Sequence, residues 1–253
     1  VIRNALALIK ANRALSLDFQ CGRDLKDLPQ EAFDDLALVF DKIAEEGEWP
    51  MNESYVPVSL IPKPDGGDRP IGVTPLMVAL FFKSLTSFVL TWDEAAMDFW
   101  EDAIKGSSAL RAGLYRRLTD ECTCALGAAT ASIYWDVEKF YDSMPIAKLI
   151  KAGLAMEYHP KLLALNMQVC LAARTVQVGP SCTEMILPNA SIDLGLGEAN
   201  NLARMIVTDD TPPPDPEDRT PVDDNQDRMD HDSNGDVISC LVSHWEINDD
   251  SSV

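Results

Sequence analysis

An apolar run that ends in a carboxylate and turns into a helix lies near the middle of the chain. Residues 133–137 have the composition of a buried strand, and Asp136 stands near its end. Two aromatic residues and a second acid, Asp142, follow before Pro145 opens a helical pattern. A carboxylate at the tip of a strand can hold a cation such as Mg²⁺, which takes oxygen ligands and needs only one or two protein carboxylates. The alternative interpretation is a buried strand with a solvated aspartate at its exit.

A hairpin is predicted ahead of this stretch. Residues 56–60 alternate between apolar and other side chains, and a second apolar segment begins at Ile71. The sequence Asp-Gly-Gly-Asp at residues 65–68 separates them and is a strong turn signal. The hairpin would present Lys63 and Arg69 on its two arms, and two such cations form a site for a polyanion such as a triphosphate. A solvated turn with ordinary surface charge is the alternative.

Helical periodicity dominates the rest of the chain. Helices are expected over residues 5–17, 29–46, 76–91, 95–104, 107–126, 145–156, 161–173 and 199–207. A further strand is expected at residues 175–178. Gly195 and Gly197 precede the last helix, where glycine lets a backbone or a ligand approach closely. Their spacing is not G-x-G-x-x-G, so no dinucleotide site is predicted.

The net charge of −20 is concentrated at the end of the chain. Residues 208–253 hold 14 Asp and Glu against 2 Lys and Arg, and they open with a proline-rich stretch at 211–216. Such a composition predicts a disordered acidic tail. The acidic balance argues against wholesale wrapping of nucleic acid, although it leaves room for a local basic groove.

Cysteine usage and hydropathy predict an intracellular protein. The 6 cysteines have neither disulfide nor zinc spacing, so we expect reduced thiols. The N-terminus has no secretory signal pattern. The most apolar segment, residues 76–92, is interrupted by Lys83 and is short for a bilayer span, so no membrane partner is expected. These features do not distinguish a nuclear from a cytoplasmic location.

The order of the motifs resembles a reverse transcriptase, the RNA-directed DNA polymerase of retroelements. Residues 61–71 resemble the fingers hairpin and residues 136–142 the first catalytic palm motif. Residues 191–204 resemble the glycine turn and helix that lie beneath the template and the incoming nucleotide. Residues 219–226 resemble the last palm motif, with its pair of aspartates.

The resemblance implies an α+β fold of the right-hand polymerase type. Fingers and palm would consist of helices packed on a small antiparallel sheet, followed by the disordered acidic tail. N-terminal helices and the fingers hairpin would occupy residues 1–92, the palm-like region residues 93–207, and the tail residues 208–253. The last palm motif would then lie inside the tail. No thumb follows it, so the chain is expected to be a truncated or degenerate polymerase domain.

The resemblance also implies a role for each matching residue. Asp136, Asp223 and Asp224 would be catalytic, and two Mg²⁺ ions would be held by Asp136, Asp223 and the carbonyl of Val137. The ions would activate a primer 3′-hydroxyl and stabilise the leaving pyrophosphate. The residues expected to bind substrate are Lys63 and Arg69 at the triphosphate, Tyr141 against a ribose 2′-hydroxyl, and Gly195 and Gly197 beside the base pair. The implied partners are an RNA or DNA template-primer and a dNTP.

Some residues depart from the family's pattern. Pro221 and Asn225 flank the aspartate pair where the family has strand-forming or apolar residues, and Glu198 places a carboxylate in the glycine turn. A rival for the second acidic motif is Asp209-Asp210. The alternative function is therefore a non-catalytic fingers-and-palm remnant that binds nucleic acid or protein.

The tail admits two further interpretations. Residues 230–237 resemble the front of an EF-hand calcium loop, but Leu241 stands at position twelve, where a bidentate glutamate is needed. The acidic tail as a whole is also a candidate binding segment for a basic partner.

Overall fold

The computed structural model describes residues 1–10, 13–16, 18–64, 66–96, 108–130, 139–179, 181–193 and 195–210. The chain divides into two compact units. The main unit consists of Val1–Ala96 and Lys139–Asp210, and the second unit of Met97–Glu138 and Thr211–Val253. Within the second unit, the described residues contain one helix, α6 (Ala109–Ala125).

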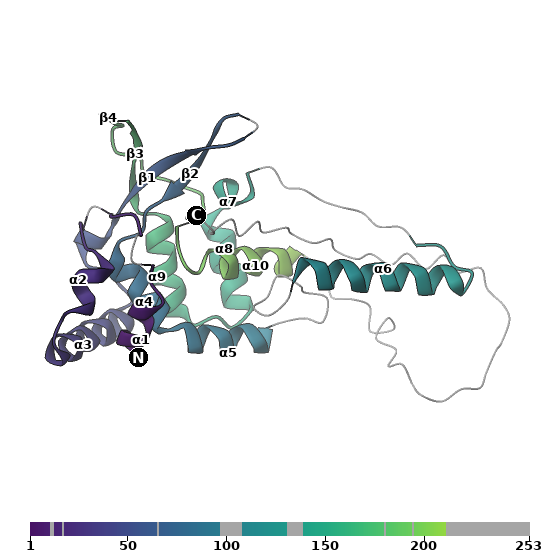
Figure 1. The fold of residues 1–253 in the computed structure, drawn as a ribbon, viewed down its shortest axis with the longest axis horizontal. Helices are drawn as coiled ribbons and strands as arrows, with labels where there is room; N and C mark the ends of the chain where they lie inside the picture. Colours follow the sequence, from purple (N-terminus) through teal and green to yellow (C-terminus); the bar gives the residue numbers. More distant parts are fainter. Residues whose placement is uncertain are drawn as a thin grey trace. The chain divides into compact units, whose positions relative to one another are not determined.

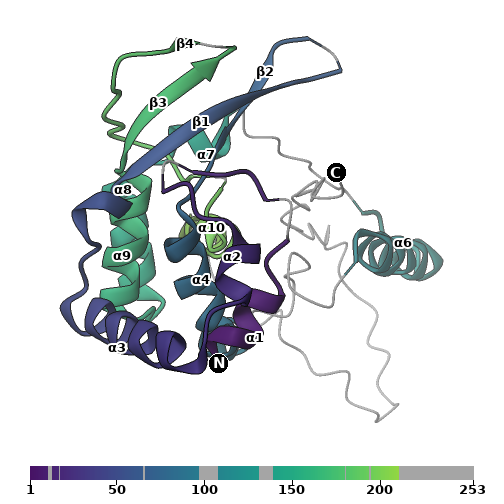
Figure 2. The same cartoon turned by 60° about the vertical axis from the view of Figure 1, so that its left-hand side comes forward.

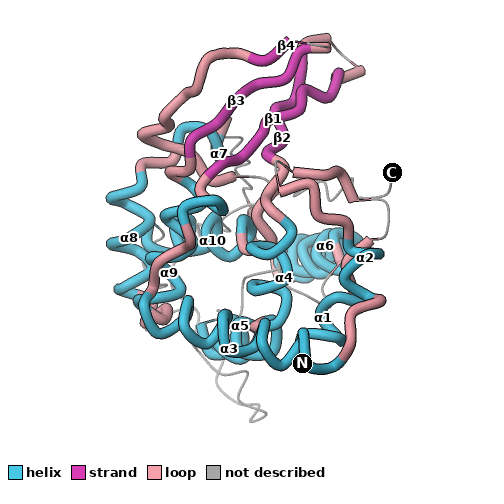
Figure 3. Tube along the Cα trace, turned by 90° about the vertical axis from the view of Figure 1, so that its left-hand side faces the viewer, coloured by secondary structure: helices cyan, strands magenta, loops and turns pink. Residues whose placement is uncertain are grey.

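The main unit is α+β, as predicted, and its elements are labelled in Figure 1. The helices are α1 (Ile2–Ala7), α2 (Gly22–Lys26), α3 (Gln30–Glu46), the 3-10 turn η1 (Met51–Glu53), α4 (Leu76–Ser84), α5 (Thr86–Ala96), α7 (Phe140–Ser143), α8 (Ile146–Ala155), α9 (Pro160–Cys170) and α10 (Ala199–Asp210). The strands are β1 (Tyr55–Pro62), β2 (Asp68–Gly72), β3 (Ala173–Val178) and β4 (Ser181–Cys182). The strands stand at one end of the unit and the helices gather below them (Figure 3).

The four strands form a mixed sheet in the order β2-β1-β3-β4. β1 and β2 are antiparallel, with Ile61 opposite Arg69, whereas β1 and β3 are parallel, with Val58 opposite Val176. The expectation of an antiparallel sheet is therefore wrong for the central pair. The reason is topological. A parallel pair needs a long crossover connection, and the chain between β1 and β3 passes through several helices before it returns.

The hairpin and the helix before it agree with the sequence. β1 and β2 pair from Pro62 and Asp68 inward, and Val56 and Val58 are buried as the alternation predicted. Helix α3 begins immediately after Pro29 and ends at Gly47, whose φ of 74° places it in the left-handed conformation that glycine adopts at helix ends. Local turn and cap chemistry fixed both elements.

An aromatic cluster joins α3 and α4 in the core of the main unit. Phe81 of α4 makes edge contacts with Phe40 of α3 and with Trp49, at centroid distances of 5.4 and 5.1 Å. The Trp49 indole N–H donates to the Leu165 carbonyl of α9 at 3.0 Å. α3, α4 and α9 lie beneath the sheet in Figure 2. This cluster joins α3, α4 and α9 in the core.

The predicted helix at residues 76–91 is broken into α4 and α5, with a bend of 57° at Leu85. Ser84 and Thr86 flank the break, and their hydroxyls donate to the carbonyls of Phe81 and Lys83 at 2.7 and 2.8 Å. Such side-chain bonds compete with the helix ladder. Among the described residues, no single helix is long and apolar enough to cross a membrane, and α4 with α5 reaches that length only as a bent pair.

The predicted helix at residues 5–17 is also shorter than expected, because α1 ends at Ala7. Arg13, Ser16 and Asp18 instead contact the segment that links β2 to α4. Ser16 donates to the Val73 carbonyl at 2.8 Å, and Asp18 accepts from the Leu76 amide at 2.7 Å. These bonds satisfy amide and carbonyl groups at the start of α4, so tertiary contacts outweigh the helical pattern.

Three predicted features lie wholly or mostly outside the described residues. They are the helix at residues 95–104, of which only residues 95 and 96 are described, the strand at residues 133–137, and the tail beyond residue 210, which contains the EF-hand-like stretch. The proposed domain boundaries at residues 92/93 and 207/208 stay predictions.

Candidate functional site

The turn that contains Gly195 packs against the base of the β1–β2 hairpin. A Cβ built on Gly195 would stand 1.8 Å from the carbonyl oxygen of Gly72, the last residue of β2. The hydroxyl of Thr74 donates to the Gly195 carbonyl at 2.7 Å, and the Gly195 amide donates to Asp193 Oδ1 at 3.0 Å. Gly195 therefore holds two backbones together. The backbone that approaches Gly195 closely is that of Gly72, in the protein's own chain.

Asp193 is the buried partner of this contact. Its side chain is almost inaccessible, and a Cβ on Gly72 would stand 2.1 Å from its Oδ1. Burial raises the pKa of the Asp193 carboxyl, while the Gly195 amide and Arg174 oppose the rise. Among the described residues, its Oδ2 has no hydrogen-bond partner. Asp193 is not among the residues predicted from the sequence, although a single acid between Ile192 and the glycines was a usable signal.

Tyr141, near the end of the first predicted palm motif, lies against the same turn. The Ile192 amide donates to the Tyr141 carbonyl at 2.7 Å, and the Ser191 amide donates to the Met144 carbonyl at 3.0 Å. The hydroxyl of Tyr141 donates to Oδ1 of Asn200 on α10 at 3.3 Å. Burial raises the pKa of this hydroxyl, so it stays protonated and able to donate at neutral pH. Tyr141 and the glycine turn thus form one local structure.

Gly197 differs from Gly195 in its surroundings. It is exposed, a Cβ built on it would meet nothing within 4 Å, and its φ is not positive. Packing within the described residues therefore does not require glycine here. The open face of the turn lies at Gly197.

Lys63 and Arg69 lie toward the turn end of the β1–β2 hairpin, as predicted. Both are exposed, and the Lys63 amide closes the turn by donating to the Gly67 carbonyl at 3.0 Å. Arg69 is three residues along β2 from Gly72, a distance of about 10 Å in an extended strand. The two cations are therefore on the same hairpin whose base contacts the glycine turn, but they stand away from that contact.

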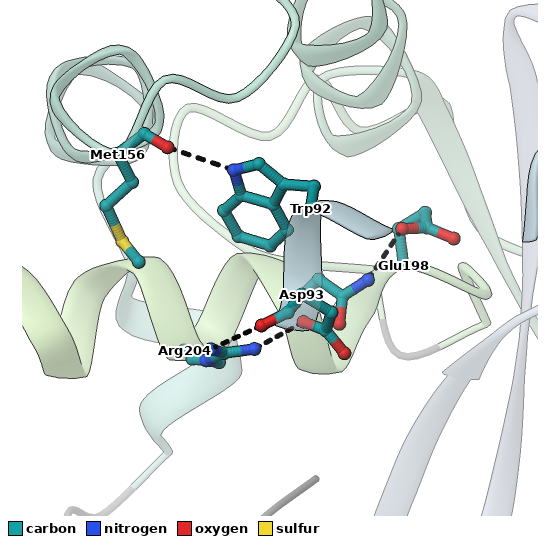
Figure 4. Close-up of polar contacts among 6 residues, drawn as sticks. Trp92, Asp93, Met156, Glu198 and Arg204 are labelled. Carbon is teal, nitrogen blue, oxygen red and sulfur yellow. Dashed lines mark hydrogen bonds and ion pairs between the residues drawn. The ribbon is translucent and has the colours of Figure 1, made fainter. Parts of the chain in front are cut away.

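Glu198 is turned into the protein. Its carboxyl is buried and accepts from the Asn201 amide group at 2.8 Å (Figure 4). Burial raises the pKa of Glu198 to about 7, and nearby Asp93 adds to the rise, whereas Asn201, Lys83 and Tyr158 oppose it. The carboxylate that departs from the family pattern is thus withdrawn from the open face of the turn.

An ion pair lies next to Glu198 and ties α10 to α5. The guanidinium of Arg204 contacts the Asp93 carboxylate and donates to the Asp93 carbonyl at 3.2 Å (Figure 4). Arg204 also lies over the Trp92 ring at 5.7 Å, and the Trp92 indole donates to the Met156 carbonyl at 2.9 Å. The sequence analysis missed this pair. The sequence does contain a signal for it, because Arg204 stands between two apolar residues, Ala203 and Met205, which are buried in the structure.

The predicted catalytic and metal-binding residues Asp136, Val137, Asp223 and Asp224 lie outside the described residues. The described part of the chain contains no cluster of three or more His, Cys, Asp or Glu suited to a metal ion. The rival pair Asp209-Asp210 forms the end of helix α10, whereas the family's last palm motif needs a hairpin.

Comparisons with known proteins leave the site to be interpreted from its own residues. A scan against models of protein families finds no match, and a search of curated proteins finds no significantly similar sequence. The chemistry is therefore inferred from the motifs and from the contacts of the main unit.

Proposed function

We propose that the chain is a reverse transcriptase-like domain that transfers nucleotides to a primer 3′-hydroxyl under the direction of a template. One observation carries the proposal. The end of β2, directly after the hairpin motif, contacts the glycine turn at Gly72 and Gly195, and that turn bonds to Tyr141 of the first palm motif. Thr74 and Gly195 are 121 residues apart in the chain.

This convergence supports a fingers-and-palm arrangement. A polymerase must bring a triphosphate-binding hairpin, a nucleotide-facing turn and a catalytic strand to one place, because its reaction depends on positioning and on charge neutralisation. Tyr141 follows Asp136 by five residues in the sequence. Tyr141 and Asp136 therefore belong to the same sequence motif.

Each element has a role in the proposed reaction. Lys63 and Arg69 are exposed cations that neutralise the triphosphate, and Arg69 offers a planar fork suited to phosphate oxygens. Gly197 leaves the face of the turn open to the base pair. Mg²⁺ ions held by Asp136, Asp223 and the Val137 carbonyl, with Asp224 beside them, would supply the Lewis acid.

A primer-extension assay tests the proposal. The full chain is given Mg²⁺, the four dNTPs and a labelled primer annealed to an RNA or a DNA template. We expect extension by the wild type and a loss of at least about 100-fold in Asp136→Ala, because a metal carboxylate is removed. The matched control is Asp35→Ala, which removes an exposed acid from α3.

The outcomes separate the proposed enzyme from its alternative. Extension that persists in Asp136→Ala would contradict the site assignment. A wild type that binds the template-primer in a gel-shift assay but never extends it would support the non-catalytic remnant. A wild type that neither binds nor extends it would reject both the polymerase and the nucleic-acid-binding remnant.

A further inference from the structure

Tyr141 bridges the two ends of the glycine turn. Its backbone carbonyl accepts from Ile192 at the start of the turn, at 2.7 Å. Its hydroxyl donates to Asn200 in the first turn of α10, at 3.3 Å and 59 residues away in the chain. Tyr141 is thereby bonded to the turn through its main chain and through the tip of its ring. In the sequence, the open position Gly197 lies between the two partners, Ile192 and Asn200.

The ring is also supported from behind. Phe140, which is buried, packs edge-on against it with a centroid distance of 5.5 Å. A tyrosine side chain has only two rotatable bonds before its hydroxyl, so a backbone anchor, a neighbouring ring and one bond at the tip restrict it strongly. Of these three restraints, the bond at the tip comes from a side chain on α10.

We infer that Asn200 is a positioning residue, which holds Tyr141 in the position that separates deoxyribonucleotides from ribonucleotides. This inference rests on the proposed function and extends it to Asn200, which lies within the matched residues 191–204 but is given no role by the resemblance. A ring that is held can exclude a 2′-hydroxyl, because it cannot swing aside to admit the extra atom. A ring that has lost its bond at the tip can do so.

The hydroxyl itself is suited to this bond. Burial keeps it protonated at neutral pH, so it acts as the donor, and the Asn200 carbonyl oxygen is the acceptor. The distance is long for a hydroxyl donor, so the bond is of moderate strength. We therefore expect a moderate effect on selectivity and no loss of the fold, because Asn200 is exposed.

The test measures the ratio of kcat/KM for a dNTP to kcat/KM for the matching NTP in the full chain. Tyr141→Phe and Asn200→Ala should each lower this ratio by about three- to tenfold, the worth of one hydrogen bond. The double variant should lower it no further, because both changes remove the same bond. Asn200→Asp keeps an acceptor oxygen and should retain the wild-type ratio.

Matched controls lie elsewhere in the chain. Tyr115→Phe removes a hydroxyl from an exposed tyrosine of α6, and Asn4→Ala removes an exposed amide from α1. Both should leave the ratio unchanged. Circular dichroism and thermal unfolding would check the fold of every variant.

The two proposals fail in different ways. A wild type that extends primers with dNTPs, together with variants that keep its ratio, would overturn the role of Asn200 alone. Additive losses in the double variant would also overturn it. A wild type that incorporates neither nucleotide, and binds neither in an equilibrium assay with template-primer, would overturn both proposals.

Discussion

The Cα of Gly195 faces the main-chain carbonyl of Gly72 so closely that no larger residue fits without movement of the backbone. A Cβ there would stand 1.8 Å from the carbonyl oxygen. We expect Gly195→Ala to lower the free energy of unfolding by about 2–4 kcal/mol, because neither backbone can yield as a side chain would. Urea unfolding followed by tryptophan fluorescence measures this cost.

Gly197→Ala is the matched control, two residues away. A Cβ at Gly197 meets nothing within 4 Å and its φ is not positive, so the substitution should leave stability unchanged or raise it by up to about 1 kcal/mol. Equal costs at the two glycines would contradict the packing described for Gly195. If Gly197→Ala keeps stability but weakens nucleotide binding, the open face of the turn gains direct support.

The parts of the fold that local chemistry determines could be predicted from the sequence. Residues 65–68 encode a tight turn, and Gly47 encodes a helix end, so the hairpin and α3 followed from a few neighbouring residues. The break at Leu85 depends on whether two hydroxyls bond to the helix backbone, which a periodic pattern does not reveal. The parallel pairing of β1 with β3 joins strands far apart in the chain, and no local signal encodes it.

The sequence predicted which residues belong to the candidate site better than it predicted what those residues contact. Tyr141 and Gly195 were selected by motif, and the structure brings their segments together. The reason for glycine at position 195 was different from the expected one, since its neighbour is Gly72. Asn200 was missed because its bond to Tyr141 spans 59 residues. The roles of Asp136 and Asp223 stay predictions.

Removal of Arg204 should destabilise the main unit strongly. The side chains of Arg204 and Asp93 are only 9% and 15% exposed, so Arg204→Ala leaves a carboxylate largely out of water and without this partner. We expect a loss of about 3 kcal/mol in the free energy of unfolding. Adding Asp93→Asn should recover part of the loss, because the stranded charge is then gone.

The control is an exposed pair of the same chemistry. On α6, Arg117 Nε lies 2.8 Å from Glu121 Oε1, and the two side chains are 74% and 58% exposed. Arg117→Ala should therefore lower the free energy of unfolding by less than about 0.5 kcal/mol. Similar costs for Arg117→Ala and Arg204→Ala would show that burial does not strengthen the Asp93 contact.

Glu198 should make the stability of the protein depend on pH. Its pKa is raised from 4.5 to about 7 in the folded state, so the folded protein holds the proton more tightly than the unfolded chain. This contribution is fully present below about pH 4.5 and is lost as the pH rises through 7. The free energy of unfolding should therefore fall by up to about 3 kcal/mol over that range, relative to Glu198→Gln.

The comparison with Glu198→Gln separates the proton of Glu198 from those of other buried carboxyls. Burial also raises the pKa of Asp193 and Glu53, and these carboxyls contribute in the same direction in both proteins. Urea unfolding at several pH values between 4.5 and 8 measures the difference. Parallel pH profiles for the wild type and Glu198→Gln would contradict the assignment of the proton to Glu198.

Loss of either hairpin cation should weaken nucleotide binding without changing stability. Lys63 and Arg69 are exposed, so Lys63→Ala and Arg69→Ala should leave the thermal midpoint within about 2 °C of the wild type. In the proposed reaction each cation contacts the triphosphate, and its removal should raise KM for the dNTP about tenfold, with a weaker dependence on salt. Arg69→Lys should recover only part of the affinity, because an ammonium cannot bind two phosphate oxygens at once.

Lys42→Ala separates a specific contact from a general effect of charge. Lys42 is 72% exposed on α3, where it pairs with Glu46 at 3.6 Å, and its removal changes the net charge by the same amount. Steady-state incorporation at two salt concentrations would compare the three alanine variants. If Lys42→Ala raises KM as much as Lys63→Ala and Arg69→Ala, the hairpin has no special role, and the triphosphate responds only to the overall charge of the protein.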